Sequence, residues 1–335
     1  MNRKIYYDKI RILAMFLVIG VHAVGSIAQF AQGVVQETVA GTLDSINSLG
    51  VPIFFALSGL FILSKDYTDI IGFYKKRLIR IGIPYLIYSI LYVCYFTGYE
   101  ENNIFGIPAA YVKDILTANV HPTHWFVYSI IGLYFAAPFL SRMFHAISDD
   151  ELKILFGGCL LVTVLCRSFE LFGLSFGVGD VVFNSGALWS FIGAYSFNRL
   201  MGTKGGNNIL VKYHLLISGI LAVLYVISKE GLFSQIAVMF LLIDDGTTDD
   251  KNESIWNNLI GDISKHSYSV YLIHAAVISL LLRLYTNWTD FFIVKCFLIY
   301  IVVFLISFAL VKIIDFLITD RIICLANRWT QNPAK

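Results

Sequence analysis

Arg11 and His22 are the residues whose types and spacing indicate chemistry. Ten residues separate them in the apolar stretch RILAMFLVIGVH. Eleven helical positions at about 100° each return to within about 20° of one face, and their rise of roughly 16 Å is about half of a ~30 Å hydrocarbon core. One helix face is therefore predicted to carry a cation near the membrane surface and an imidazole near the midplane. An ionisable side chain at that depth costs at least about 2.5 kcal/mol, so we expect a functional cavity or partner there.

The composition is typical of a polytopic membrane protein. Of the 335 residues, 57% are hydrophobic and 14% are charged, and the mean hydropathy is +0.72. Apolar blocks separated by glycine, proline and charge clusters predict an all-α membrane bundle of about ten transmembrane helices. The predicted spans are 10–30, 44–64, 78–99, 124–142, 153–174, 180–198, 210–228, 232–243, 267–285 and 291–314.

A single integral membrane domain is predicted over residues 1–335. The longest polar stretches, 100–122 and 244–266, are too short for a separate soluble catalytic domain. The eighth span, 232–243, is short, because twelve residues make only about 18 Å of helix. Whether this segment crosses the membrane, re-enters it or forms a broken hairpin with the preceding span is left open.

The distribution of basic residues predicts the orientation. With the N-terminus inside, the outer side keeps only Lys113, Lys229 and Arg283 near its loops. This asymmetry follows the positive-inside rule, so we expect a multi-pass plasma-membrane protein with both termini in the cytoplasm. The basic residues assigned to the cytoplasmic side are Arg3, Lys4, Lys9, Arg11, Lys65, Lys75, Lys76, Arg77, Arg80, Arg142, Lys153, Arg199, Lys204, Lys212, Lys251, Lys265, Lys312, Arg321, Arg328 and Lys335.

A second basic group lies at the predicted cytoplasmic entrance of the third span, in KKRLIRIGIP. Arg77 and Arg80 are three residues apart, so they share a helix face, and a guanidinium fork suits bidentate contact with phosphate. With Lys76 beside them, they indicate a phosphate-bearing cytoplasmic ligand. The charge alone also fits, more simply, a positive-inside anchor that touches anionic lipid.

Three further segments are candidates for a substrate cavity. In VPIFFALSG, a proline precedes Ser58 and permits either a substrate-lining break or an ordinary small-residue packing face. His124 and Trp125 lie at the predicted outer mouth of the fourth span, where the indole is either a stacking surface for a sugar or a membrane-interface residue. Tyr271 and His274 share a helix face in the ninth span. No metal site is predicted, because His121 and His124 have no identifiable third ligand.

These motifs resemble those of the integral membrane acyltransferase 3 family. The Arg11 and His22 spacing, VPIFFALSG, the Arg77 and Arg80 pair and SYSVYLIH follow one another in the order seen in that family. The resemblance covers nearly the whole chain. The segment HWFVYSIIGLYFAAPFL also looks like family members grouped with O-acetyltransferases of cell-surface glycans.

The resemblance implies transfer of an acyl group, usually acetyl, from cytoplasmic acetyl-CoA to a hydroxyl of an acceptor at the outer face. It assigns the family's Arg-and-His motif to Arg11 and His22, and its donor-associated motif to Arg77 and Arg80. The expected partners are acyl-CoA, an extracytoplasmic glycan or other hydroxyl acceptor, and membrane lipid, without nucleic acid.

Within this scheme His22 is the expected general base on the acceptor hydroxyl, with direct attack on the thioester preferred over a transient acyl-histidine. Arg11 is expected to position the donor, because about 16 Å of helix rise separates it from His22. A competing hypothesis is transport of a small polar solute, with His22 and His274 as a proton relay. The lack of a detectable internal repeat counts against that reading.

Overall fold

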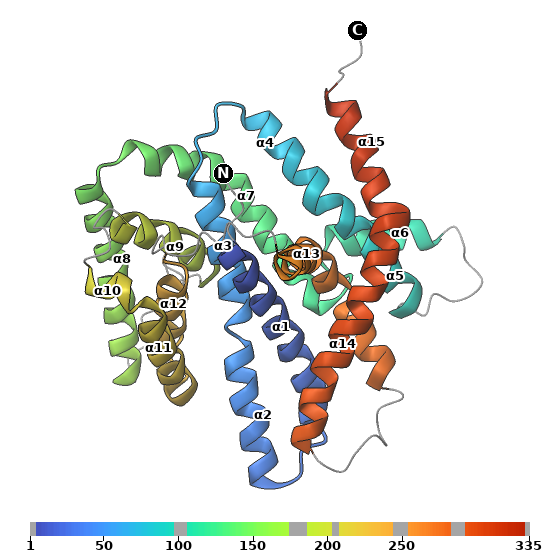
Figure 1. Ribbon diagram of the computed structural model, residues 1–335, viewed down its shortest axis with the longest axis horizontal. Coiled ribbons are helices and arrows are strands. Elements are labelled where there is room, and N and C mark those ends of the chain that lie inside the picture. The colour runs from blue at the N-terminus through green and yellow to red at the C-terminus, as the bar shows by residue number, and fades with distance from the viewer. Residues whose placement is uncertain are drawn as a thin grey trace. The chain divides into compact units, whose positions relative to one another are not determined.

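The computed structural model describes residues 5–96, 106–173, 186–202, 208–243, 254–282 and 292–331. Throughout these ranges the regular secondary structure is helical, and no strand is present among them (Figure 1). The predicted all-α membrane bundle is therefore confirmed.

The helices follow one another in this order: α1 (Ile5–Ala28), α2 (Gly33–Asn47), α3 (Gly50–Leu63), α4 (Ile70–Arg77), the π-helical η1 (Leu78–Gly82), α5 (Ile83–Phe96), α6 (Gly106–Leu116), the 3₁₀-helical η2 (Pro122–His124), α7 (Trp125–Ala146), α8 (Asp149–Leu171), α9 (Gly186–Gly202), α10 (Ile209–Lys212), α11 (His214–Ser228), α12 (Gly231–Leu241), α13 (Ile255–Leu282), α14 (Phe292–Ile314), the π-helical η4 (Asp315–Thr319) and α15 (Asp320–Gln331).

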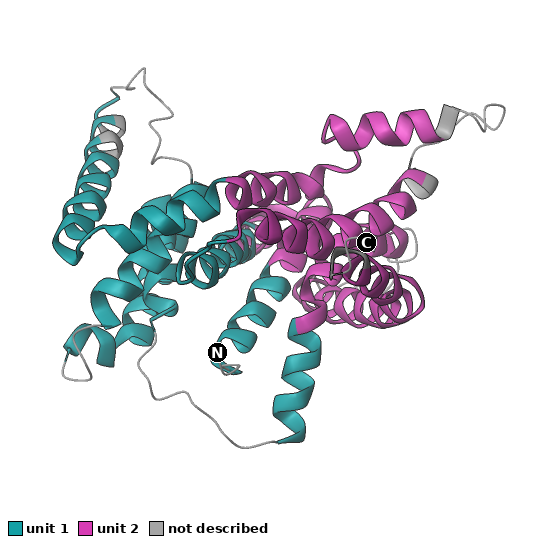
Figure 2. Cartoon of the chain, turned by 90° about the horizontal axis from the view of Figure 1, so that it is seen from above, with its two compact units in different colours: residues 1–17, 41–68, 136–264 teal, residues 18–40, 69–135, 265–335 magenta. Residues whose placement is uncertain are grey.

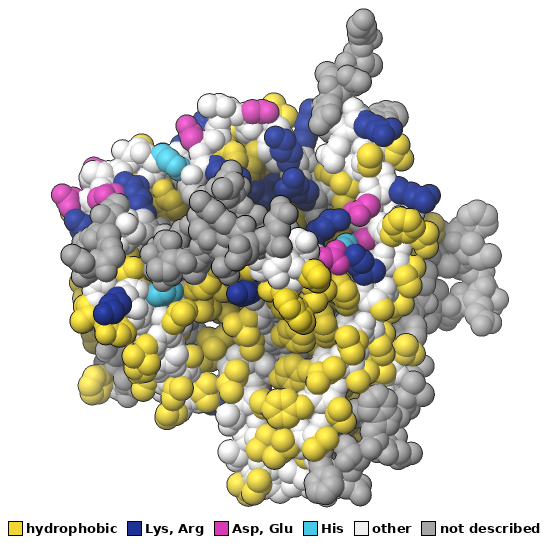
Figure 3. Space-filling view, in the orientation of Figure 1, with side chains coloured by type: hydrophobic (Ala, Val, Ile, Leu, Met, Phe, Trp, Pro, Cys, Tyr) yellow, Lys and Arg dark blue, Asp and Glu magenta, His cyan; other side chains and the backbone are white. Residues whose placement is uncertain are grey.

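Four helical stretches of the described chain are long and apolar enough to cross a membrane: Ile5–Ala28, Gly33–Leu63, Pro122–Ala146 and Phe292–Arg328. The predicted count of ten spans is not confirmed and stays a prediction, and several predicted spans extend in part beyond the described ranges. The predicted short eighth span corresponds to α12, which has 11 residues. On the face shown in Figure 3, hydrophobic side chains gather over the lower part, as expected for helices that face lipid.

The chain forms two compact units, coloured separately in Figure 2. Unit 1 comprises residues 1–17, 41–68 and 136–264, and unit 2 comprises residues 18–40, 69–135 and 265–335. Helices α1, α2, α7 and α13 contribute residues to both units.

Helix α3 is the buried centre of unit 1. Its sequence, GVPIFFALSGLFIL, is apolar around the whole circumference, which is typical of a helix that has neighbours on every side. Ala56, Leu57 and Leu60 pack in one core cluster with residues of α9 and α12. At Gly59 the backbone approaches Phe191 of α9 so closely that an added Cβ would overlap the Phe191 carbonyl. A side chain larger than hydrogen is therefore excluded at this contact.

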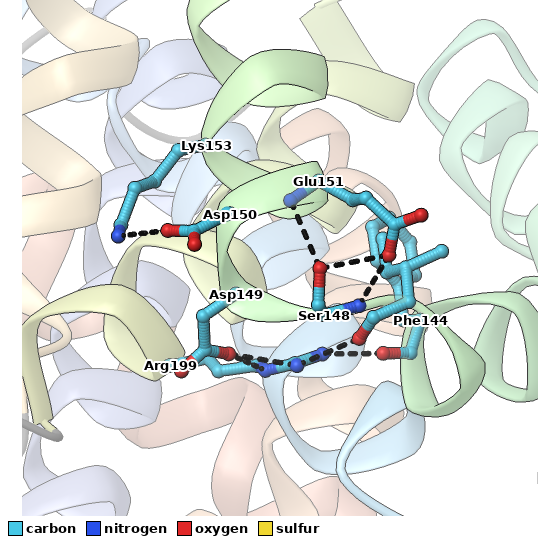
Figure 4. A network of polar contacts seen from close by, with 8 residues as sticks. Phe144, Ser148, Asp149, Asp150, Glu151, Lys153 and Arg199 are labelled. Carbon is cyan, nitrogen blue, oxygen red and sulfur yellow. Dashed lines mark hydrogen bonds and ion pairs between the residues drawn. The ribbon is translucent and has the colours of Figure 1, made fainter.

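A polar network joins the ends of α7, α8 and α9 within unit 1 (Figure 4). Ser148 and Glu151 form a reciprocal capping box at the start of α8: the Ser148 N–H donates to Glu151 Oε2 at 2.7 Å, and the Glu151 N–H donates to Ser148 Oγ at 3.2 Å. Arg199 of α9 donates to Asp149 Oδ1 at 2.8 Å and to the carbonyls of Phe144 and Ile147. One guanidinium thus satisfies carbonyls that the end of α7 leaves unpaired.

In unit 2, α4 continues into α5 through the π-helical turn η1. The Ile83 N–H donates to the Leu78 carbonyl, an i+5 bond. Pro84 follows directly and has no N–H to donate to the Arg80 carbonyl, so the regular helical ladder is interrupted there. Single π turns of this kind occur frequently at functional sites, and this one carries Arg80.

We expect Gly59→Ala to destabilise the protein by about 1–3 kcal/mol, because the new methyl group must displace the α9 backbone. Thermal unfolding of the purified protein in detergent measures this effect. Gly219→Ala is the matched control, since nothing lies within 4 Å of a Cβ added there. An unchanged unfolding temperature for Gly59→Ala would contradict the close approach of α3 and α9.

Candidate active site

His22 lies on α1 in unit 2, where it meets a second histidine. The half-buried His22 ring lies 5.1 Å, centroid to centroid, from the ring of His274 on α13, and the two planes are tilted by 38°. His274 is fully buried. The structure therefore brings together two histidines that the sequence places 252 positions apart.

The backbone of α13 fixes the tautomer of His274. Its Nδ1 lies 2.5 Å from the carbonyl oxygen of Tyr271. Because a carbonyl oxygen only accepts, Nδ1 carries the proton and Nε2 presents a lone pair. In the part of the chain that the structure describes, this buried Nε2 has no hydrogen-bond partner.

His124, at the end of η2, is held in the same way. Its Nε2 lies 3.2 Å from the carbonyl oxygen of Leu272, so this nitrogen is the donor and Nδ1 has the lone pair. The side chain is fully buried, and Nδ1 finds no partner within the described ranges. Two aromatic rings enclose it, with centroid distances of 4.6 Å to Tyr92 and 5.6 Å to Tyr85.

Tyrosine hydroxyl groups tie these elements together. Tyr271 donates to the Thr123 carbonyl at 2.5 Å and so joins α13 to η2. Tyr128 donates to the Ile115 carbonyl at 2.7 Å, which leaves Tyr85 as the donor in its 2.7 Å hydrogen bond to Tyr128. We call His22, His124, His274 and these surrounding tyrosines, Tyr85, Tyr92, Tyr128 and Tyr271, the histidine–tyrosine cluster. All of its members belong to unit 2.

Two residues at the edge of this cluster have different settings. His121 caps η2 through Nδ1, which lies 2.8 Å from Thr123 Oγ1, and its ring is 4.9 Å from Tyr92. Burial lowers the pKa of His121 below its usual value, which favours the neutral ring. Trp125 is 49% exposed, and its ring lies 6.4 Å from that of Phe126.

Arg11 belongs to unit 1, where its guanidinium contacts Asp8 and Ser264. Its Nη1 lies 3.6 Å from Asp8 Oδ1 and 3.2 Å from Ser264 Oγ, and the Ser264 hydroxyl donates to the same carboxylate oxygen at 2.5 Å. The guanidinium also lies over Phe61, 5.9 Å from the ring centroid. The Arg11 side chain keeps 34% of its surface exposed. The sequence interpretation missed Asp8, although the spacing of three residues could have revealed the pair.

The basic group predicted at the donor entrance is ordered around Arg77. Its guanidinium lies between two aromatic rings, 5.2 Å from the Phe73 centroid and 5.0 Å from the Tyr134 centroid. Stacking of this kind orients the planar fork. Lys76 and Arg80 are exposed at the end of α4 and in η1. The arrangement suits a flexible, multiply phosphorylated ligand.

Ser58 lies on α3 of unit 1 and is half-buried. It is not a member of the histidine–tyrosine cluster. Of the residues predicted for the acceptor side or cavity, the cluster thus gathers His124, Tyr271 and His274, and it does not include Ser58 or Trp125.

A buried polar network in unit 2 was not predicted from the sequence. His266 Nδ1 lies 2.9 Å from Asp315 Oδ2, and Tyr88 donates to Asp315 Oδ1 at 2.9 Å. All three residues are at most 5% exposed. His266 is the last residue of the polar stretch 244–266, and Asp315 directly follows the predicted tenth span, so both residues lie at predicted boundaries. A carboxylate next to the long apolar run of α14 was the available signal.

Among the described residues no group of three or more histidine, cysteine or acidic side chains is arranged to hold a metal ion.

The structure is thus that of a helical membrane protein with a buried polar site, in which two histidines are bonded to backbone carbonyls. A family model described as an acyltransferase domain matches residues 4–312. The chain belongs to this acyltransferase 3 family, and it is a membrane acyltransferase. No curated protein and no solved structure shows significant similarity to it.

We expect Asp315→Asn to destabilise the protein strongly, by about 3–5 kcal/mol, because the new amide group turns a donor toward His266 or Tyr88 and breaks a buried pair. Tyr88→Phe removes one hydrogen bond and should cost about 1 kcal/mol. Thermal unfolding in detergent ranks the variants.

Asp320→Asn is the matched control, because Asp320 forms an exposed ion pair with Lys265 at 3.5 Å. Exposed pairs contribute about 0–1 kcal/mol. Equal shifts for Asp315→Asn and Asp320→Asn would show that the network does not stabilise unit 2.

Proposed function

We propose that this protein is an O-acyltransferase that moves an acetyl group from cytoplasmic acetyl-CoA to a hydroxyl of an extracytoplasmic cell-surface glycan. The observation that carries the proposal is the pairing of His22 with the buried His274 at 5.1 Å in a member of an acyltransferase family. The proposal places the protein in the plasma membrane with both termini in the cytoplasm, in keeping with its basic residues.

In the proposed reaction His22 removes the proton from the acceptor hydroxyl. The hydroxyl oxygen then attacks the thioester carbonyl and forms the new ester bond, while the carbon–sulfur bond breaks. The thiolate of coenzyme A leaves and takes the proton from His22. General base catalysis of this kind contributes about 10²–10⁴-fold to the rate.

The donor is proposed to bind through Arg77, Arg80 and Lys76. Acetyl-CoA carries several phosphate groups and does not cross lipid, so its nucleotide requires a basic site at the membrane surface. The stacked Arg77 supplies an oriented fork, whereas Arg80 and Lys76 are exposed and can follow a flexible ligand. Arg11 is proposed to position the donor, because its guanidinium stays partly exposed beside Asp8.

His22→Gln should lower acetyl transfer by at least about 100-fold, because the neutral amide is not a base. The assay uses purified protein in liposomes loaded with acetyl-CoA and supplied outside with surface-glycan fragments. It measures release of coenzyme A thiol together with acetylated glycan. Full activity in His22→Gln would remove His22 from the reaction. His22-dependent solute flux without thiol release would instead favour a transporter.

Arg80→Ala should raise the KM for acetyl-CoA by about 10–100-fold, since a hydrogen bond between charged groups contributes about 1.5–3 kcal/mol. Its kcat should change far less, because the residue is assigned to binding. The same thiol assay in detergent, with acetyl-CoA titrated, measures both constants. Lys113→Ala is the matched control: Lys113 is an exposed basic residue on α6, predicted to lie on the outer side. Equal effects of the two variants would refute a specific donor site.

A further inference from the structure

Two buried imidazole nitrogens in the histidine–tyrosine cluster lack a hydrogen-bond donor. They are His124 Nδ1 and His274 Nε2, and both side chains are fully buried. The two rings are anchored on successive carbonyls of α13, because His274 binds the Tyr271 carbonyl and His124 binds the Leu272 carbonyl. Both rings therefore contact the same turn of α13 in unit 2.

Both free nitrogens are acceptors. The N–H group of each ring already donates a hydrogen bond to a backbone carbonyl, so the other ring nitrogen carries a lone pair. A buried acceptor left without a donor costs about 1–3 kcal/mol. Such a pair in one place calls for a ligand that supplies hydrogen-bond donors.

Three of the four tyrosines in the cluster direct their hydroxyl protons elsewhere. Tyr271 gives its proton to the Thr123 carbonyl, and Tyr128 gives its proton to the Ile115 carbonyl. Tyr85 in turn donates to Tyr128. These three hydroxyl protons are therefore engaged within the protein.

We propose that His124 Nδ1 and His274 Nε2 form a subsite that accepts hydrogen bonds from two hydroxyl groups of a neutral sugar. The inference deepens the proposed function, on which it rests, by naming the chemical class of the acceptor. A carboxylate or phosphate presents lone pairs of its own and is repelled by the two imidazole acceptors. The aromatic rings at 4.6 Å and 5.6 Å from His124 suit the apolar face of a sugar ring.

Substitution of His274 or His124 by Asn or Gln removes either the acceptor nitrogen or the hydrogen bond to the backbone carbonyl, so the two roles are tested separately. In His274→Asn the amide N–H₂ keeps the bond to the Tyr271 carbonyl, but the Nε2 acceptor is lost. In His274→Gln the side chain reaches the Nε2 position with an acceptor oxygen, and the carbonyl bond is lost. For His124 the roles reverse: Gln keeps the Leu272 carbonyl bond, and Asn keeps an acceptor near Nδ1.

The experiment uses methyl β-D-glucopyranoside as a neutral probe and methyl β-D-glucuronide as an anionic probe. Purified protein in detergent receives saturating acetyl-CoA and a titrated probe, and thiol release and acetylated probe are measured. The rise in unfolding temperature that each probe causes without acetyl-CoA reports binding alone. His214→Gln is the matched control, because His214 is a buried histidine of unit 1 with Nδ1 3.0 Å from the Phe240 carbonyl.

We expect the neutral probe to be acetylated and to raise the unfolding temperature more than the anionic probe. His274→Asn and His124→Gln should each raise the KM for the neutral probe by about 10–100-fold, which corresponds to one lost hydrogen bond. His274→Gln and His124→Asn, which keep an acceptor, should raise this KM less than His274→Asn and His124→Gln do, and His214→Gln should leave it near the wild-type value.

The reverse pattern, with the larger KM increase in His274→Gln and His124→Asn, would assign both histidines a structural role and overturn the subsite. The same conclusion would follow if the wild type acetylated the probe and all variants kept its KM, although the proposed function would stand. A probe-induced temperature shift that disappears in His274→Asn and His124→Gln, without any thiol release, would support the subsite and refute the proposed reaction. Absence of both signals in the wild type would overturn both.

Discussion

The free-energy cost of leaving a buried polar group without a hydrogen-bond partner shapes unit 2. Hydrocarbon offers no hydrogen bonds, so a side chain that leaves water must bind the backbone or another side chain. Tyr271 and Tyr128 meet this requirement through the carbonyls of Thr123 and Ile115. Tyr88 meets it through Asp315. These bonds connect helices that apolar packing alone would allow to slide, and they hold the candidate site in place.

The same requirement sets the chemistry of the histidines. A carbonyl that accepts from one ring nitrogen fixes the proton there and leaves a lone pair on the other nitrogen. This backbone-anchored arrangement is found for both His124 and His274. A general base also needs a free lone pair. The backbone hydrogen bond to one ring nitrogen thus keeps the lone pair of the other nitrogen available for a hydroxyl group. This links the structural role of these residues to the proposed acyl transfer.

Sequence spacing predicted what lies within one helix and not what lies between helices. The spacing of Arg11 and His22 predicted one continuous helix, which α1 confirms. The periodicity of the ninth span likewise placed Tyr271 and His274 together. The pairing of His266 with Asp315 escaped prediction because the two residues are 49 positions apart and belong to different helices. Periodicity reports the face of a helix, whereas tertiary packing determines which helix that face meets.

The cations near Asp8, Asp320 and the aromatic rings of unit 2 lie in different settings from the imidazole of His124, and in the proposed reaction this separation favours a neutral base. Three cations have a local partner: Arg11 has Asp8, Lys265 has Asp320, and Arg77 has two aromatic rings. In contrast, the ring contacts of His124 are to His121, Tyr85 and Tyr92, all uncharged when the imidazoles are neutral. In the proposed function, the phosphate-bearing donor binds beside Arg77 and the neutral hydroxyl binds beside the histidines. Two chemically different substrates would then not compete for one site.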